Sequence, residues 1–222
     1  SKKAAPKKAA KKAAKKAVAK PAARAADKKA ADKKAGKKIV AKAAAPKKAA
    51  SKPAAKKAKA PSGPIWQWTA TQTAAAIRSG AISAEEAVRA HVERMAAVNP
   101  RLNAVVFDFS DDAIKAAKAA DRARAKGAEL GALHGVPITI KENVDYQGYP
   151  NPNGVKALLG QIAPSDAPVV RNLKKAGAIV LGLTNTPEFS FRAFTDNPLH
   201  GLTLNPWDDA ITCGGSSGGA AS

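Results

Sequence analysis

Cysteine, aromatic residues and long apolar runs are all scarce in this 222-residue sequence, and each scarcity excludes a class of protein. The single cysteine, Cys213, cannot form a disulfide within the chain, which excludes a disulfide-stapled secreted scaffold. The longest apolar runs, such as 176–183, are far shorter than the roughly 20 residues that a membrane-spanning helix needs. No apolar segment typical of a signal peptide follows the first lysines. We therefore expect a cytoplasmic protein with no membrane partner.

Acidic residues are almost missing from the first 60 positions. This segment holds 23 Lys and Arg against two acids, a net charge of +21, together with 25 alanines and no aromatic residue. Subtracting these charges from the chain totals of 38 and 17 leaves 15 basic and 15 acidic groups in the other 162 residues. A segment of this composition buries too little surface to offset the entropy lost on ordering. We predict a disordered basic tail over 1–64 and a globular domain over 65–222.

Repeated Lys-Lys-Ala-Ala units fill the tail, and in composition they resemble the tails of histone H1-like nucleoid proteins. Closely spaced ammonium groups displace counterions from phosphates, so one hypothesis is non-specific DNA or RNA binding through residues 1–60, with association to the nucleoid. The lack of aromatic residues gives no support for stacking on single-stranded bases. The alternative is a solubilising or surface-adhering tail whose affinity for polyanions follows from its charge alone.

Beyond a cluster of Pro, Ser and Gly at 61–64, helix and strand patterns alternate along the sequence. Helices are predicted over 70–78, 83–99, 111–126 and 165–176, and strands over 104–109, 136–140 and 178–183. The predicted N-caps are Ser83, Ser110 and the pair Ser165-Asp166, and the helix after Ser83 is expected to stop at Asn99-Pro100. This alternation predicts an α/β domain with a mixed, largely parallel sheet flanked by helices, and then a long functional loop over 184–222.

Six ordered segments of this domain resemble the amidase signature family. They are NPRLNA at 99–104, LHGVPITIKEN at 133–143, AGA at 176–178, TNTPEF at 184–189, NPW at 205–207 and GGSSGG at 214–219. Each segment is a weak signal by itself, but their order and spacing together make the match specific. The similarity runs from about residue 83 to 222.

The resemblance implies hydrolysis of a small-molecule carboxamide by a Ser–cisSer–Lys triad, with no cofactor and no metal. Lys141 matches the catalytic lysine of the family, and Ser216 matches the bridging serine that follows a cis peptide bond. Gly214, Gly215 and Ser217 belong to the same glycine-rich loop and are expected to shape the site. Without this context, Lys141 would be interpreted as a solvated charge and the loop as a flexible linker.

The serine that forms the acyl-enzyme is expected beyond Ser222, in a further glycine-rich segment, so we interpret the domain as the truncated N-terminal part of an amidase. Neither Ser217 nor Ser222 matches the nucleophile, and the chain alone is expected to be inactive. In this chemistry a lysine acts as a base only when it is neutral, so the site must desolvate Lys141 and lower its pKa. Ser216 would then relay a proton between Lys141 and the nucleophile.

The remaining candidate residues have structural interpretations. His91 is expected to be a packed histidine, and Cys213 a small buried residue. Asn185 and Glu188 are expected to shape the loop, and NPW at 205–207 is expected to form a packed turn. No metal-ligand spacing and no phosphate-binding glycine loop appears in the sequence.

Three functions stay open. The first is a stand-alone amidase that releases a carboxylate and ammonia or an amine. The second is a histone H1-like nucleic-acid-binding protein that carries an inactive amidase remnant. The third is a protein similar to the A subunit of tRNA-dependent amidotransferases, which the segment TPEF at 186–189 disfavours because those subunits have a Met-Asp-Glu-Phe pattern there.

Overall fold

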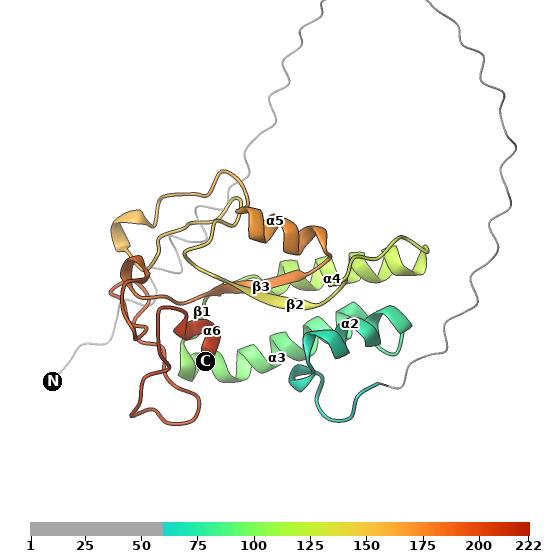
Figure 1. The fold of residues 1–222 in the computed structure, drawn as a ribbon, viewed down its shortest axis with the longest axis horizontal. Coiled ribbons are helices and arrows are strands. Elements are labelled where there is room, and N and C mark those ends of the chain that lie inside the picture. The colour runs from blue at the N-terminus through green and yellow to red at the C-terminus, as the bar shows by residue number, and fades with distance from the viewer. Residues whose placement is uncertain (1–59) are drawn as a thin grey trace, which may run out of the picture. The chain divides into compact units, whose positions relative to one another are not determined.

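The computed structural model describes residues 60–222, drawn in colour in Figure 1. The helices are α2 (Ala70–Ser79), α3 (Ala84–Leu102), α4 (Ser110–Ala125), α5 (Pro168–Lys175) and α6 (Gly218–Ala221), with short 3₁₀ turns η1 (Ile65–Gln67), η2 (Lys156–Leu158) and η3 (Glu188–Ser190). The strands are β1 (Val105–Asp108), β2 (Pro137–Lys141) and β3 (Ile179–Thr184). The predicted disorder and nucleic-acid binding of the tail lie outside the described residues, and the domain boundary at 64–65 stays a prediction.

The three strands form one sheet in the order β1-β3-β2. The pair β2 and β3 is parallel and is joined by a crossover through α5, as parallel pairing requires. The pair β1 and β3 is antiparallel, because β1 enters at the sheet edge directly from a left-handed turn at Asn103, which ends α3. The predicted α/β class with a mixed sheet and flanking helices is confirmed, whereas the expectation that the sheet is largely parallel is wrong.

The central strand β3 is buried along its whole length and separates two apolar clusters. Ile179 and Leu181 pack with residues of α2, α3 and α4 on one face, while Val180 and Leu183 pack with Val170 of α5 on the other face. Figure 1 shows α5 on one side of the sheet and α2 and α3 on the opposite side. Helices on both faces therefore hold β3, and through it the end of β2, in a fixed position.

Helices α2 and α3 begin where the sequence predicts, and α2 also ends there. Thr69 and Ser83 each form a capping box at the start of α2 and α3, with Gln72 and Glu86 as the returning side chains. Gly80 ends α2 in the left-handed conformation, with φ of 74°.

No helix within residues 60–222 combines the length and the apolar character needed to cross a bilayer.

Helix α3 continues past Pro100, so the predicted stop at Asn99-Pro100 is wrong. The proline lies in the last turn, where its missing N–H removes a single intrahelical bond. The side-chain oxygen of Asn99 accepts the backbone N–H groups of Ala104 (2.9 Å) and Val105 (2.8 Å), which closes the end of the helix. Asn103, with φ of 54°, then turns the chain into β1.

Two predicted N-caps are also wrong. Ser110 is the first residue of α4 itself, and its backbone N–H is bound by the carboxylate of Asp108 at 2.8 Å. Helix α5 begins at Pro168, which needs no N-terminal hydrogen-bond acceptor. The carboxylate of Asp166 instead accepts the N–H of Gln147 at 2.9 Å and pairs with Lys174 at 2.7 Å.

Candidate active site

Lys141 is the last residue of β2 and lies opposite Thr184 of the central strand. Its Nζ donates a hydrogen bond to Oγ of Ser216 over 2.7 Å. Burial lowers the pKa of the Lys141 ammonium below its ordinary value, because a desolvated site disfavours the charged form. The structure therefore brings together the two residues that the sequence selected, 75 positions apart, and burial shifts the pKa of Lys141 in the direction expected for a base.

The loop that carries Ser216 has an unusual backbone. Gly214 has φ of 85°, and the peptide bond between Gly215 and Ser216 is cis. A Cβ at Gly215 would lie 2.5 Å from the carbonyl oxygen of Arg192, so the close approach of these two segments requires glycine. Ser217 is exposed, immediately before α6. The backbone thus presents the Ser216 hydroxyl toward β2 rather than toward solvent.

Two buried threonines hold this loop, and the sequence analysis did not assign either to the site. Thr186 Oγ1 donates to the carbonyl oxygen of Ser216 over 3.1 Å. Thr195 Oγ1 donates to the carbonyl of Gly214 (3.0 Å) and accepts the N–H of Gly218 (3.1 Å). Thr186 lies in the segment TNTPEF at 184–189, so the family resemblance could have pointed to it. Thr195 lies in none of the six segments that carry the resemblance, and nothing in the sequence marks it.

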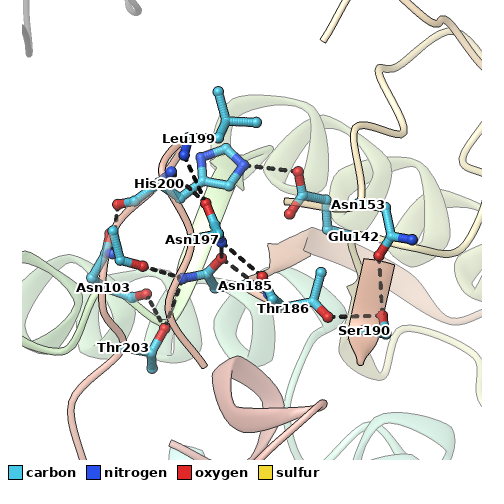
Figure 2. Close-up of polar contacts among 11 residues, drawn as sticks. Asn103, Glu142, Asn153, Asn185, Thr186, Ser190, Asn197, Leu199, His200 and Thr203 are labelled. Atoms are coloured by element: carbon cyan, nitrogen blue, oxygen red, sulfur yellow. Dashed lines mark hydrogen bonds and ion pairs between the residues drawn. The ribbon is translucent and has the colours of Figure 1, made fainter. Parts of the chain in front are cut away.

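A buried amide network anchors the chain that leads from β3 to this loop. Figure 2 shows Asn185, at the end of β3, together with Asn197 and Thr203. Asn185 Nδ2 donates to Thr203 Oγ1 (2.9 Å), and Asn197 Nδ2 donates to Asn185 Oδ1 (2.8 Å). The side chains of Asn185 and Thr203 are at most 2% exposed. The loop-shaping role predicted for Asn185 agrees with these contacts.

The described serines near the chain end differ in their surroundings from Ser216. Ser222 Oγ donates to the carbonyl of Leu204 over 2.6 Å, so its hydroxyl is engaged by the backbone and not by Lys141.

Half-buried Cys213 points its Sγ at the carbonyl of Thr203 (3.4 Å), and burial raises the pKa of its thiol. A thiol with a raised pKa is a poor nucleophile, in agreement with the structural role predicted for Cys213.

The remaining structural interpretations have mixed outcomes. His91 is partly buried, and its Nδ1 lies 2.8 Å from the carbonyl of Ala87 one turn earlier, as expected of a packed histidine. The segment 205–207 was expected to form a packed turn, but Trp207 is 92% exposed, so the expected packing of this side chain is wrong. No part of residues 60–222 covers this ring. Within the same residues, no group of three or more His, Cys, Asp and Glu side chains is placed to hold a metal ion.

Comparison with known proteins identifies the family. The family model described as Amidase matches residues 86–222. An indoleacetamide hydrolase from Bradyrhizobium diazoefficiens is 79% identical over 162 residues, which make up 73% of this chain and 31% of that protein. The A subunit of a glutamyl-tRNA(Gln) amidotransferase from Acidothermus cellulolyticus is 44% identical over 153 residues, or 69% of this chain and 30% of that protein.

Solved structures agree with the sequence relatives. A bacterial aryl acylamidase of the amidase signature family superimposes with a TM-score of 0.68 at 32% identity, over 71% of this chain and 33% of that chain. The peptide amidase from Stenotrophomonas maltophilia gives a TM-score of 0.64 at 33% identity, over 70% of this chain and 33% of that one. The chain spans about a third of the length of the relatives that it matches. It belongs to the amidase family of hydrolases.

Proposed function

We propose that Lys141 and Ser216 form the proton relay of a Ser–cisSer–Lys amidase that hydrolyses a carboxamide to a carboxylate and ammonia or an amine. The observation that carries this proposal is the 2.7 Å hydrogen bond between Lys141 Nζ and Ser216 Oγ. The lowered pKa of Lys141 supports it. A surface lysine would be charged at neutral pH and could not accept a proton.

The relay assigns a direction to each proton. A neutral Lys141 amine accepts the proton of the Ser216 hydroxyl, while Ser216 takes the proton of a nucleophilic serine outside the described residues. That serine attacks the amide carbon, and its new C–O bond replaces the C–N bond when the tetrahedral intermediate collapses. The proton then returns through Ser216 to the departing nitrogen, so that ammonia or an amine leaves as a neutral molecule. Water repeats the attack on the acyl-enzyme and regenerates the serine.

Indoleacetamide is the first substrate to test. The name of the relative that is 79% identical, indoleacetamide hydrolase, gives this compound as its substrate. The amidotransferase subunit is 44% identical to this chain. The greater identity supports a stand-alone amidase over an amidotransferase subunit. The departure of TPEF at 186–189 from the A-subunit pattern supports the same choice.

The test replaces the matching segment of the Bradyrhizobium diazoefficiens enzyme with the homologous residues of this chain and measures ammonia release from indoleacetamide. We expect turnover by this chimera and none by the 222-residue chain alone. Lys141→Ala should lower kcat by several powers of ten, because the base is lost. Lys156→Ala is the matched control, since this lysine is exposed on η2. Activity of the Lys141→Ala chimera close to that of the control would refute the relay.

A second proposal concerns the tail, whose charge of +21 over 60 residues supports non-specific binding to nucleic-acid phosphates. Nucleic-acid binding by the tail is also compatible with the histone-like alternative. If the amidase domain were inactive, this binding would be the remaining function of the chain. Turnover by the chimera decides between an amidase with a basic tail and a nucleic-acid-binding protein with a catalytically inactive domain.

A further inference from the structure

A buried acid lies next to the relay and takes no part in the proposed proton transfer. Glu142 follows Lys141 in sequence, and its side chain is fully buried. Its Oε1 lies 2.8 Å from Nε2 of His200, whose side chain is 12% exposed (Figure 2). Burying a carboxylate is costly, and this contact offsets part of that cost: Oε1 has a partner, whereas Oε2 has none within the described residues. It joins the end of β2 to a loop 58 residues further along the chain.

The backbone fixes Glu142 relative to Lys141. The N–H of Glu142 donates to the carbonyl of Thr184 over 3.0 Å, which extends the pairing of β2 with β3 by one residue. Glu142 is the second residue of the turn 141–144, in which the N–H of Val144 donates to the carbonyl of Lys141 over 3.0 Å. From this turn Glu142 contacts His200 while Lys141 contacts Ser216, so a displacement of one residue moves the other.

His200 is fixed from three sides. Its backbone N–H donates to Oδ1 of Asn197 over 2.7 Å, and its carbonyl accepts Nδ2 of Asn103 over 2.9 Å. Its ring meets the ring of Phe107 edge-on, with the centroids 5.6 Å apart. The histidine thus belongs to a rigid part of the loop that is tied to both α3 and β1.

The same loop carries the threonine that holds the Ser216 segment. The N–H of Thr203 donates to the carbonyl of Thr195 over 2.9 Å. Thr195 contacts Gly214 and Gly218, which lie on either side of Ser216. A closed path therefore runs along the chain from Lys141 to Glu142, across the contact to His200, and along the chain to Thr203. It continues through Thr195 to the glycines on either side of Ser216 and returns to Lys141 through the Lys141–Ser216 hydrogen bond.

We infer that the Glu142–His200 contact is a positioning device for the relay: it holds the 195–203 segment, and with it Ser216, in register with Lys141. Neither residue touches a reacting atom. The inference rests on the proposed function, because it assigns a purpose to the geometry of Lys141 and Ser216. It extends that function by naming two residues that lie in no proton-transfer step.

The experiment measures the environment of Lys141 in the 222-residue chain without relying on turnover. Trace acetic anhydride labels each lysine in proportion to its neutral fraction, and mass spectrometry gives a midpoint pH for Lys141 with exposed Lys156 as the internal reference. In the wild type the Lys141 midpoint should lie below the ordinary value of an exposed lysine, because burial lowers its pKa. Loosening the loop admits water to Lys141 and moves its midpoint upward.

Three variants separate positioning from packing. Glu142→Gln keeps an acceptor for His200 and should leave the Lys141 midpoint where it is in the wild type. Glu142→Ala and His200→Ala should each raise it toward the ordinary value of an exposed lysine, and the double variant should raise it no further because both break one contact. His91→Phe is the matched control, since His91 is bound within its own helix.

A variant with apolar replacements covers the case in which the alanine variants unfold. Glu142→Met with His200→Phe removes the contact and keeps the buried volume, a change that buried ion pairs often tolerate. Circular dichroism and hydrogen exchange of β3 establish that it is folded. A raised Lys141 midpoint in this folded variant is the expected result. A midpoint equal to that of the wild type would overturn the inference and leave the pair a purely structural contact.

This outcome is distinguishable from failure of the proposed function. Should the chimera hydrolyse no amide while the labelling midpoints move as expected, the contact positions Lys141 and the amidase proposal alone falls. Should the chimera turn over indoleacetamide and Glu142→Met/His200→Phe leave kcat and the Lys141 midpoint unchanged, the relay stands and the positioning role is wrong.

Discussion

At the scale of single residues, the protonation state of Lys141 decides what the site can do. Its ammonium is partly buried, and burial is the cause that lowers its pKa. Within residues 60–222, no carboxylate forms an ion pair with it, although Glu142 is its neighbour in the chain. A paired carboxylate would favour the charged form of the lysine, and the contact of Glu142 with His200 leaves Lys141 without such a partner, as the proposed relay requires.

The pH dependence of the chimera tests this state. Amide hydrolysis should be lost as the pH falls through the pKa of Lys141, because the protonated amine can accept no proton. Since that pKa lies below the ordinary lysine value, the loss should occur at a lower pH than an exposed lysine would give. The dependence of kcat/KM on pH reports the pKa values of the essential groups in the free enzyme. An acid limb at the pH where an ordinary exposed lysine titrates would contradict the desolvated site.

Motif resemblance alone selected Lys141 and Ser216, and the structure places them in contact. The contacts of Glu142 with His200, and of Thr195 with Gly214 and Gly218, could not be predicted in this way. Each contact joins residues that are far apart in the sequence, so the periodicity of a helix or a strand does not predict it. A single glutamate or threonine in a sequence also has many possible partners. Such contacts follow from the tertiary path of the 195–203 segment, which the sequence showed only as a loop.

At the scale of elements, α3 depends on its first turn. Ser83 Oγ accepts the N–H of Glu86 over 3.0 Å, and Glu86 Oε2 accepts the N–H of Ser83 over 2.7 Å. Asp121 of α4 binds the next two N–H groups of α3, those of Ala84 (2.8 Å) and Glu85 (3.0 Å). The start of α3 therefore has its backbone donors satisfied by three side chains from two helices.

Ser83→Ala should lower the free energy of unfolding by about 1 kcal/mol, because one N-cap acceptor is lost. Hydrogen bonds from the Ser83 backbone N–H and then from the Ser83 hydroxyl lower the pKa of Glu86, and Ser83→Ala removes the second of them. A carboxyl whose pKa is lower in the folded state stabilises the fold above its unfolded pKa, and this contribution disappears as the pH falls through the folded value. Urea unfolding at neutral and acidic pH should show a smaller effect of Ser83→Ala in acid. Ser62→Ala, at an exposed site before η1, is the control.

Local patterns predicted where most elements lie, because α2, α3 and the strands have periodic apolar residues and strong end signals. The N-caps of α4 and α5 failed for a physical reason. Asp108 and Ser110 are both good capping residues two positions apart, and only the path of β1 decides between them. Asp166 was predicted as a cap, but Lys174 and Gln147 compete for its carboxylate. A sequence pattern does not rank such competitors.

At the scale of the whole molecule, charge divides the chain into a segment of net +21 and a segment of net zero. The full chain should bind duplex DNA with little base preference, and its affinity should fall steeply with salt as phosphate contacts release counterions. Fluorescence anisotropy of a labelled duplex over a salt series measures the slope. Removal of residues 1–60 should abolish binding. Equal affinity of the 61–222 segment would show that the tail is not the binding element.

The exposure of Trp207 gives this molecule an optical reporter. An indole ring that is 92% exposed emits as it would in water, and acrylamide quenches it efficiently. In a variant with Trp66 and Trp68 replaced by phenylalanine, the emission wavelength would follow this one ring. Any chain that covers the 205–207 turn, such as the remainder of an amidase in the chimera, would shift the emission to the blue and protect the ring from quenching. The turn at 205–207 can thus record, in real time, when another segment of chain covers it.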